Sequence, residues 1–415
     1  MKDVWILNHY AAEPNGIGGT RHFHLASAMA KHGWCATIIA SSIELNSGRE
    51  RLGRGEKKRL DVFDRVPFLW IRVPGHVGNG GGRLLNMLAY SARVLLPSYT
   101  RELNRPDAIV GSSVHPFAAL AGALLAKRHG VPFIFEVRDL WPRTLIDLGR
   151  IKENSFTAMW MRWLERFLYR CASRIVVLLP KAADYIAPLG ISREKIVWIP
   201  NGVDVGFFAK DIGKAVGPST DIMYFGAHGQ ANALEPLIDA MAVLRRRPHA
   251  AAIKLRLIGN GDKKKALIAR AASLGLNDST VSFEDPVAKK EIPKLASEAD
   301  AFVIHVPDRA ELYRYGISPN KLFDYMAAGR AIVMACAENI DFTREYGCGV
   351  WAPPEDPEGL ADAFERMAAM PVEERRRMGV NGRRAVEENF SFDQLSKSFA
   401  SVLDDSINAC GKMQK

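Results

Sequence analysis

The sequence predicts an α/β protein with two doubly wound, Rossmann-like domains that face a central cleft. Short apolar segments alternate with helical segments along the whole chain, which is typical of parallel sheets covered by helices on both faces. A turn-rich stretch at Pro200–Asp204, followed by the loosely composed Lys210–Thr220, divides the strands into two series. A TIM barrel would also alternate, but the mid-chain boundary disfavours it.

The predicted strands follow one another along the chain. The first series is Val4–Leu7, Cys35–Ala40, Phe68–Val73, Ala108–Gly111, Pro132–Val137, Arg174–Leu178 and Ile196–Ile199. Helices are expected near Thr20–Lys31 and from Pro116 to about Arg128. The second series is Asp221–Phe225, Ile253–Ile258, Thr280–Phe283, Ala301–Val306 and Ala331–Ala335, with a helix between successive strands. The charged and irregular Ser41–Pro67 is expected to be a long loop or a mobile insertion.

The composition limits the class of protein. A chain of 415 residues, 48% of them hydrophobic, is long enough for two domains of about 200 residues each. The apolar run Ala118–Ala126 is too short to span a bilayer, which needs about 20 residues. The N-terminus has the character of a first strand and not of a signal peptide. The 5 cysteines are scattered, which favours reduced thiols in the cytoplasm and disfavours a structural zinc site.

The net charge of +10 indicates an anionic partner. Nucleic acid, an anionic membrane surface and phosphorylated small molecules are the candidates. The basic residues form no long tail, and the usual nucleic-acid-binding motifs are absent, so nucleic acid is disfavoured.

Residues 160–170 predict a basic amphipathic helix. Trp160, Trp163, Leu164 and Phe167 share one stripe, and Arg162, Arg166 and Arg170 form another. Leu84–Leu96 is a second apolar candidate. Such helices can lie in a bilayer interface, although most of them pack on a protein core.

The segment from Gly316 to Gly329 predicts a helix with an anion site at its start. Ser318 suits the N-cap, Pro319 the first helical position and Gly329 the position after the C-cap. A helix N-terminus offers unpaired N–H groups and a positive dipole end. Asn320 and Asp324 share one face, and Asp324 lies about 9 Å along the axis from the cap. This arrangement suits a nucleotide diphosphate sugar, but an ordinary capped helix has the same features.

Glycine turns follow several strands. Gly18, Gly19 and Arg21 belong to the first turn, where they are expected to contact the phosphate or sugar of a donor. This turn lacks the G-x-G-x-x-G spacing of a dinucleotide site. Gly226 follows the first strand of the second domain, and Gly259 and Asn260 follow the next. Each turn alone could be a simple loop. Together with the helix at Ser318, the two later turns indicate phosphate binding at one sheet edge.

Two strand ends of the first domain carry candidate catalytic residues. His115 follows the strand at Ala108–Gly111 and could act as a base or bind a hydroxyl group, or it could satisfy a turn. Arg138 and Asp139 follow the strand at Pro132–Val137. Arg138 could neutralise phosphate and Asp139 could accept hydroxyl protons, or the two could form an internal ion pair.

The chain resembles glycosyltransferase family 4, with its GT-B fold, over nearly its full length. The matching segments are Gly16–Gly19, Arg138–Pro142, Ile199–Asp204, Gly259–Asp262 and Pro319–Gly329. Within the family it is most similar to bacterial O-antigen and exopolysaccharide transferases of the L-fucosamine transferase type. The resemblance implies an acceptor-binding domain at residues 1–203, a nucleotide-sugar-binding domain at 204–391, and a helix at 392–412 that crosses back to the first domain.

The resemblance also implies a donor site, with departures. The two family glutamates fall at Gly316 and Asp324, so Asp324 is expected to bind the ribose and backbone amides of Ile317–Asn320 to assist the donor. The family's Arg and Lys fall at Ala227 and Asn232, so Lys321, Arg138 and the helix dipole are expected to meet the diphosphate charge. The family's cleft histidine falls at Arg138.

The resemblance implies a retaining, metal-independent transfer from a UDP-sugar, with no cofactor. The sugar, an N-acetylated amino sugar, would pass to a lipid-diphosphate-linked glycan of the undecaprenyl type, on the inner face of the bacterial plasma membrane. A nucleotide-sugar 2-epimerase or hydrolase has the same fold and stays an alternative. A non-catalytic nucleotide or nucleic-acid binding protein is the alternative of another class.

Overall fold

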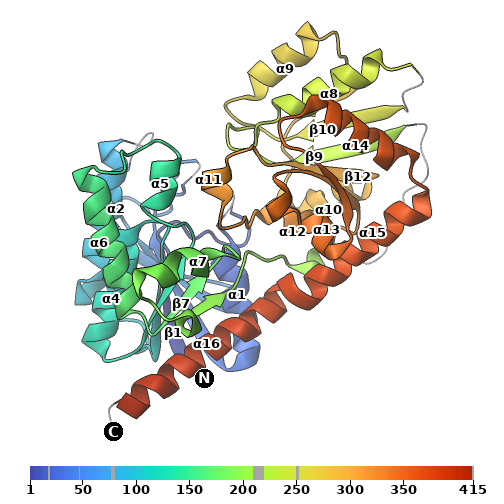
Figure 1. Cartoon of the computed structure of the whole chain (residues 1–415). Coiled ribbons are helices and arrows are strands. Elements are labelled where there is room, and N and C mark those ends of the chain that lie inside the picture. The colour runs from blue at the N-terminus through green and yellow to red at the C-terminus, as the bar shows by residue number, and fades with distance from the viewer. Residues whose placement is uncertain (17–18, 46, 76–79, 209–218, 249–251, 414–415) are drawn as a thin grey trace. The chain divides into compact units, whose positions relative to one another are not determined.

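The computed structural model describes residues 1–16, 19–45, 47–75, 80–208, 219–248 and 252–413, which form two compact units (Figure 1). Unit 1 contains Met1–Asn201, Arg314–Ile317 and Phe392–Lys415, and unit 2 contains Gly202–Tyr313 and Ser318–Ser391. Each unit is built on one mainly parallel sheet. The predicted fold class, two parallel-sheet α/β domains, is confirmed.

Unit 1 has an eight-stranded sheet in the order β3-β4-β2-β1-β5-β6-β7-β8. Its strands are β1 (Lys2–Leu7), β2 (Trp34–Ser41), β3 (Lys58–Phe63), β4 (Val66–Ile71), β5 (Ala108–Ser112), β6 (Phe133–Val137), β7 (Arg174–Val177) and β8 (Ile196–Trp198). All neighbours are parallel except β3 and β4, which pair antiparallel. The strand order reverses between β1 and β5, and ligands of open α/β sheets bind at the carboxyl ends of strands at such a point.

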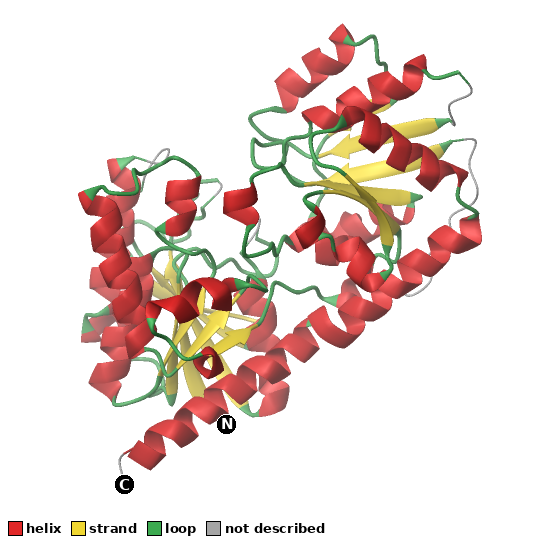
Figure 2. Cartoon of the chain, viewed as in Figure 1, coloured by secondary structure: helices red, strands yellow, loops and turns green. Residues whose placement is uncertain are grey.

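Helices cover both faces of the unit 1 sheet (Figure 2). The first face is covered by α2 (Gly81–Val94), α4 (Pro116–His129) and α6 (Phe156–Cys171), and the second by α1 (Arg21–Met29) and α16 (Phe392–Met413). The short helices are α3 (Pro97–Thr100), α5 (Arg143–Asp147) and α7 (Ala182–Ile186). His24 stacks on Phe392 with 4.7 Å between ring centroids, and Phe399 is fully buried. The C-terminal helix is therefore part of the unit 1 core.

Unit 2 has a six-stranded parallel sheet in the order β11-β10-β9-β12-β13-β14. The strands are β9 (Thr220–Phe225), β10 (Ile253–Ile258), β11 (Val281–Glu284), β12 (Ala301–His305), β13 (Ala331–Ala335) and β14 (Gly349–Ala352). The helices are α8 (Glu235–Arg246), α9 (Lys264–Ser273), α10 (Ile292–Ser297), α11 (Ala310–Tyr313), α12 (Asn320–Ala327), α13 (Phe342–Tyr346), α14 (Pro357–Ala369) and α15 (Val372–Ala385). The strand order reverses between β9 and β12, so the turn after β9 is a candidate ligand site.

The expectation that Ser41–Pro67 is a long loop is wrong in its second half. Lys58–Phe63 forms β3 and pairs with β4 along its whole length. The sequence of β3 alternates charged and apolar residues, and most of its side chains stay partly exposed at the sheet edge. It lacks the continuous apolar run that revealed the central strands, and its antiparallel partner supplies the hydrogen bonds. The short β14 was not predicted either.

The described residues include no helix that is long and apolar enough to cross a membrane. In the same part of the chain, no group of three or more His, Cys, Asp or Glu side chains could hold a metal ion.

Candidate functional site

Helix α12 begins one residue later than the sequence predicts. Pro319, with ψ of 131°, is the N-cap, and Asn320 is the first helical residue, so the expected roles of Ser318 and Pro319 shift by one position. Pro319 itself makes no side-chain hydrogen bond to the helix start. Gly329, with φ of +69°, adopts the left-handed conformation expected after the C-cap. A helix start presents N–H groups that have no partner within the helix itself, so a ligand can bind here.

Helix α12 is fixed to the end of β9. The buried Tyr325 hydroxyl donates to the carbonyl O of Phe225 (3.0 Å) and accepts from its N–H (2.9 Å). The Tyr325 ring also stacks on Phe302, with 4.3 Å between centroids. These contacts, made by the second turn of α12, hold the helix in place beside the turn that carries Gly226, and functional side chains need such rigid support.

The glycine turns after β9 and β10 pack backbone against backbone. A Cβ atom at Gly259, whose φ is +145°, would lie 1.9 Å from the carbonyl O of Gly226. His228 donates its N–H to the carbonyl O of Asn260 (2.9 Å), and the side chain of Asn260 accepts from the N–H of Gly261 (2.8 Å). The structure thus brings Gly226, Gly259 and Asn260 together, and Asn260 supports its own turn.

Lys321 joins the first turn of α12 to the turn after β9. Its Nζ donates to the Tyr224 hydroxyl (2.9 Å) and to Oδ1 of Asn232, and lies 4.7 Å from the centroid of the Tyr224 ring. Burial lowers the pKa of Lys321 to about 8. Asn232 stands where the resemblance places the family's lysine. The amine that reaches this position therefore comes from α12, and no local sequence pattern shows this contact.

Asp324 lies one turn further along α12. Burial raises the pKa of Asp324 to about 7, although the positive charge of Lys289 opposes the shift. Asn320, on the same helical face, is exposed. The sequence did not single out Lys289, because its proximity to Asp324 arises only when the segment before α10 folds onto α12.

Gly316 and Ile317 belong to unit 1, whereas Ser318, Pro319 and Asn320 belong to unit 2. Gly316 has φ of +96°, and a Cβ atom there would lie 2.5 Å from Cγ of Pro180. The Tyr315 carbonyl accepts from the N–H of Lys181 (3.0 Å). A glutamate at position 316 would therefore be strained and would clash, so this position can offer only its backbone.

Arg138 and Asp139 line a pocket of unit 1. The cavity has a volume of about 230 Å³, and Asn8, Tyr10, Gly19 and Arg51 also line it. Gly19 has φ of +66°, and a Cβ atom there would lie 2.8 Å from the carbonyl O of Tyr10. Gly18 lies outside the described residues.

The structure does not support the expected donor-binding role of Arg21. Its side chain is buried, its Nε pairs with Glu136 at 3.1 Å, and it donates to the carbonyl groups of Ile199 (2.9 Å) and Pro200. Although burial opposes it, the charges of His22 and Arg21 hold the pKa of Glu136 well below its usual range. Arg21 therefore ties helix α1 to β6 and to the chain after β8. Glu136 is 115 residues away in sequence, so no local sequence pattern predicts that it pairs with Arg21.

His115 caps helix α4. It is fully buried, its Nδ1 accepts from the N–H of Ala118 (3.2 Å), and its Nε2 lies 2.8 Å from Nδ1 of His9. Because Nδ1 accepts, Nε2 carries the proton and donates to His9. Burial lowers the pKa of His115 to about 3. This geometry gives His115 the turn-satisfying role that the sequence offered as the alternative to a catalytic one.

Two domain models match the chain. A glycosyl transferase 4-like domain matches residues 18–202, and a glycosyl transferases group 1 domain matches residues 219–370. A protein from Pseudomonas aeruginosa described as the probable glycosyltransferase WbjE is 24% identical over 324 residues, which are 73% of this chain and 76% of that protein.

Solved structures share the fold. HepE of Anabaena, in complex with UDP and glucose, is 16% identical, with a TM-score of 0.65 over 97% of this chain and 99% of that chain. WaaG, described as a glycosyltransferase involved in lipopolysaccharide biosynthesis, is 16% identical, with a TM-score of 0.63 over 97% and 99%. The chain thus has the GT-B fold, with residues 18–202 matching a glycosyltransferase 4-like domain and residues 219–370 matching a group 1 glycosyltransferase domain.

Proposed function

We propose that the protein is a retaining glycosyltransferase that moves an N-acetylated amino sugar from a UDP-sugar to a lipid-diphosphate-linked saccharide in the assembly of a cell-surface polysaccharide. The observation that carries the proposal is the placement of Lys321 and Asp324 on α12. Lys321 reaches the turn after β9 at the switch point of the unit 2 sheet, and Asp324 follows one helical turn later.

The donor contacts follow from these positions. The diphosphate would lie against the N–H groups at the start of α12 and the amine of Lys321, because both are positive. The ribose hydroxyl groups would donate to the carboxylate of Asp324. The complex of HepE with UDP and glucose supports a nucleotide sugar as the partner of this fold.

The proposed chemistry needs no covalent nucleophile. The acceptor hydroxyl would attack from the face that the diphosphate leaves, and a β-phosphate oxygen would take its proton. Lys321 and the helix start would stabilise the charge that develops on the leaving diphosphate, which is commonly the largest catalytic contribution.

Saturation-transfer NMR with the full-length protein and a panel of UDP-, GDP- and dTDP-sugars tests the donor. We expect transfer to the uridine and ribose protons of UDP-sugars only. Radiolabelled UDP-N-acetylhexosamine and a bacterial lipid extract then test transfer, with labelled lipid as the expected product. Turnover without extract would instead identify an epimerase or hydrolase, and failure to bind any nucleotide sugar would refute the proposal.

A basic and apolar face of unit 1 supports a membrane-linked acceptor. Helices α2, α4 and α6 lie side by side, and their exposed apolar residues are Leu84, Leu85, Leu88, Leu124, Phe156, Met159, Trp160 and Trp163. The predicted stripe is correct for Trp160 and Trp163, but Leu164 is fully buried in the core. Exposed tryptophan and leucine side chains on one layer suit a bilayer interface.

The charge of this face is positive. The three helices carry Arg83, Arg93, Lys127, Arg128, Arg162, Arg166 and Arg170 and one acidic residue, Glu165. Glu165 is buried and bonds to the hydroxyl groups of Tyr169 (3.0 Å) and Tyr185 (3.1 Å), and burial raises its pKa to about 8. It therefore adds little negative charge at neutral pH. We infer that anionic lipid is the partner of this face.

Replacing both Arg166 and Arg170 with Glu is expected to release the protein from vesicles that contain anionic lipid. Neither side chain has an ion pair among the described residues, and both line an open groove beside Trp163. Each basic residue near an anionic surface contributes about 1 kcal/mol, so reversing two should weaken binding by about 30-fold or more. Vesicle sedimentation measures the effect.

The exposed Arg376 and Arg377 on α15 provide a matched control. Their replacement by Glu makes the same change in net charge in unit 2 and should leave vesicle binding unchanged. Equal release by both variants, or wild-type protein that ignores anionic vesicles, would contradict the assignment of this face.

A further inference from the structure

The switch point of the unit 1 sheet opens onto the 230 Å³ pocket that Arg138 and Asp139 line. Asn8 and Tyr10 follow β1, and Val114 follows β5, so the pocket lies at the carboxyl ends of the strands between which the order reverses. Sites for drug-sized ligands have volumes of about 300–1,000 Å³. The pocket therefore suits one sugar ring better than a nucleotide.

The charged groups around the pocket balance one another. Glu44 and Asp139 contribute carboxylates, and Arg51 and Arg138 contribute guanidinium groups. A diphosphate favours an excess of positive charge, whereas hydroxyl groups can donate to carboxylates and accept from guanidinium groups. The lining therefore matches an uncharged ring with several hydroxyl groups.

The side chain of Arg51, which lines the pocket, is held by three contacts with other residues. Its Nε and Nη2 donate to Oε2 of Glu13 at 3.1 and 2.7 Å, and its guanidinium lies 4.5 Å from the centroid of the Trp70 ring. The Arg51 side chain is only 7% exposed. Although burial opposes it, the hydrogen bond from Arg51 lowers the pKa of Glu13. The charge of Arg51 is therefore already paired and is not available to a phosphate.

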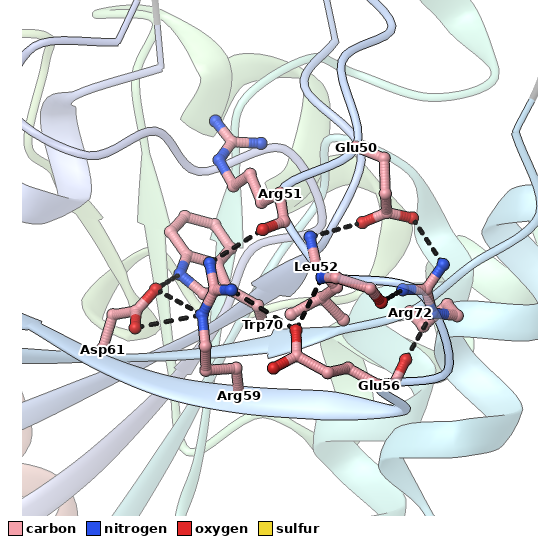
Figure 3. Close-up of polar contacts among 9 residues, drawn as sticks. Glu50, Arg51, Leu52, Glu56, Arg59, Asp61, Trp70 and Arg72 are labelled. Carbon is pink, nitrogen blue, oxygen red and sulfur yellow. Dashed lines mark hydrogen bonds and ion pairs between the residues drawn. The ribbon is translucent and has the colours of Figure 1, made fainter.

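A polar network fixes the chain on both sides of Arg51 (Figure 3). Its members are Glu50, Glu56, Arg59, Asp61, Trp70 and Arg72. Arg59 donates to the carbonyl O of Arg51 (2.8 Å) and pairs with Asp61 (3.1 Å), and Asp61 accepts from the indole N–H of Trp70 (2.9 Å). Glu50 joins Arg72 (3.3 Å) to the N–H of Leu52 (2.9 Å). The part of Ser41–Pro67 that carries Arg51, which the sequence predicted as a loop, is therefore held in one conformation by these polar contacts.

Apart from its contact with the Trp70 ring, the guanidinium of Arg51 takes no part in this network, in which only its backbone carbonyl accepts a hydrogen bond, from Arg59. Among the described residues, no hydrogen bond joins Nη1 of Arg51 to the protein. Nη1 therefore keeps its donors, on a side chain that lines the pocket and is held by Glu13 and Trp70. A donor fixed in this way can distinguish one hydroxyl configuration from another, because the wrong epimer leaves it unpaired.

Resting on the proposed function, we propose that this pocket binds the reacting sugar ring of the acceptor, and that Arg51 is a specificity-determining residue which donates through Nη1 to one of its hydroxyl groups. The network of Figure 3 is a positioning element for Arg51.

Saturation-transfer NMR on the full-length protein tests this inference with free hexoses and N-acetylhexosamines as probes, with and without saturating UDP. We expect one configuration to bind and UDP to leave that binding intact. Arg51→Lys keeps a charge beside Glu13 and Trp70 but loses the planar fork, so it should weaken sugar binding about tenfold. Arg51→Met should abolish sugar binding, and both variants should bind UDP as the wild type does.

Arg49 provides the matched control. It also contacts Glu13, at 3.5 Å, but its side chain is 65% exposed and it does not line the pocket. Arg49→Met should therefore leave sugar binding unchanged. Equal loss in Arg49→Met and Arg51→Met, or displacement of the bound sugar by inorganic pyrophosphate, would overturn the role of Arg51. Binding of UDP without binding of any sugar would overturn the pocket assignment but leave the proposed transferase intact, whereas failure to bind UDP would refute the proposed function itself.

Discussion

Replacement of Lys321 by methionine is expected to lower kcat for sugar transfer by about 100- to 1,000-fold, the usual cost of removing one preorganised group that stabilises transition-state charge. The side chain is held by the Tyr224 hydroxyl and by Asn232, so little reorganisation is needed when the diphosphate leaves. Methionine fills a similar volume without charge. The Tyr224 hydroxyl keeps its bond to the carbonyl O of Ala227 (2.8 Å), so the turn should stay intact.

Lys265 on α9 is the control for this substitution. It is exposed in the same unit and has no ion pair among the described residues, so Lys265→Met should leave kcat unchanged. Steady-state kinetics with UDP-sugar and acceptor separate the effects. A Lys321→Met enzyme with wild-type kcat would show that the leaving diphosphate does not depend on this amine.

The alternation of segments was sufficient to predict the two sheets, because the central strands of a parallel sheet are apolar along their whole length. Val4–Leu7 and Ala331–Ala335 are such strands, and their predicted bounds agree with β1 and β13 within two residues. The edge strand β3 escaped prediction because none of its residues is buried and its partner lies across a turn. A continuous apolar run therefore identifies a strand only where both faces of that strand are buried.

Candidate site residues were predictable where the contact is local in sequence and unpredictable where it is not. Lys321 and Asp324 share a helix with its cap, so helical spacing relates them directly. Arg21 pairs with Glu136, and His115 with His9, in both cases more than 100 positions away. These contacts give two candidate site residues a structural role. A charged residue after a glycine turn can serve either purpose, and only the fold decides between them.

Replacement of Asp324 by asparagine is expected to weaken UDP-sugar binding by about 30-fold at pH 7.5. Loss of the charged carboxylate acceptor costs about 2 kcal/mol of binding free energy for the ribose hydroxyl groups that donate to it. Asparagine has the same shape and retains one neutral acceptor oxygen. Isothermal titration with a UDP-sugar measures the change. Asp278→Asn, at an exposed turn of unit 2, is the control and should bind the donor normally. Unchanged affinity in Asp324→Asn would remove the ribose role of this residue.

The pH dependence of donor binding provides a sharper test, because the two residues on α12 titrate in opposite senses. Asp324, with a pKa near 7, gains its charge as the pH rises, whereas Lys321, with a pKa near 8, loses its charge. The affinity for a UDP-sugar should therefore increase from pH 6, reach a maximum between pH 7 and 8, and fall above pH 8. The UDP-sugar is the correct probe, since a terminal phosphate such as that of UDP itself titrates near pH 6. Asp324→Asn should remove only the acidic limb of this profile and Lys321→Met only the alkaline limb. A bell-shaped pH profile that persists in both variants would assign the two ionisations to other groups. Those groups, and not Asp324 and Lys321, would then bind the ribose and the diphosphate.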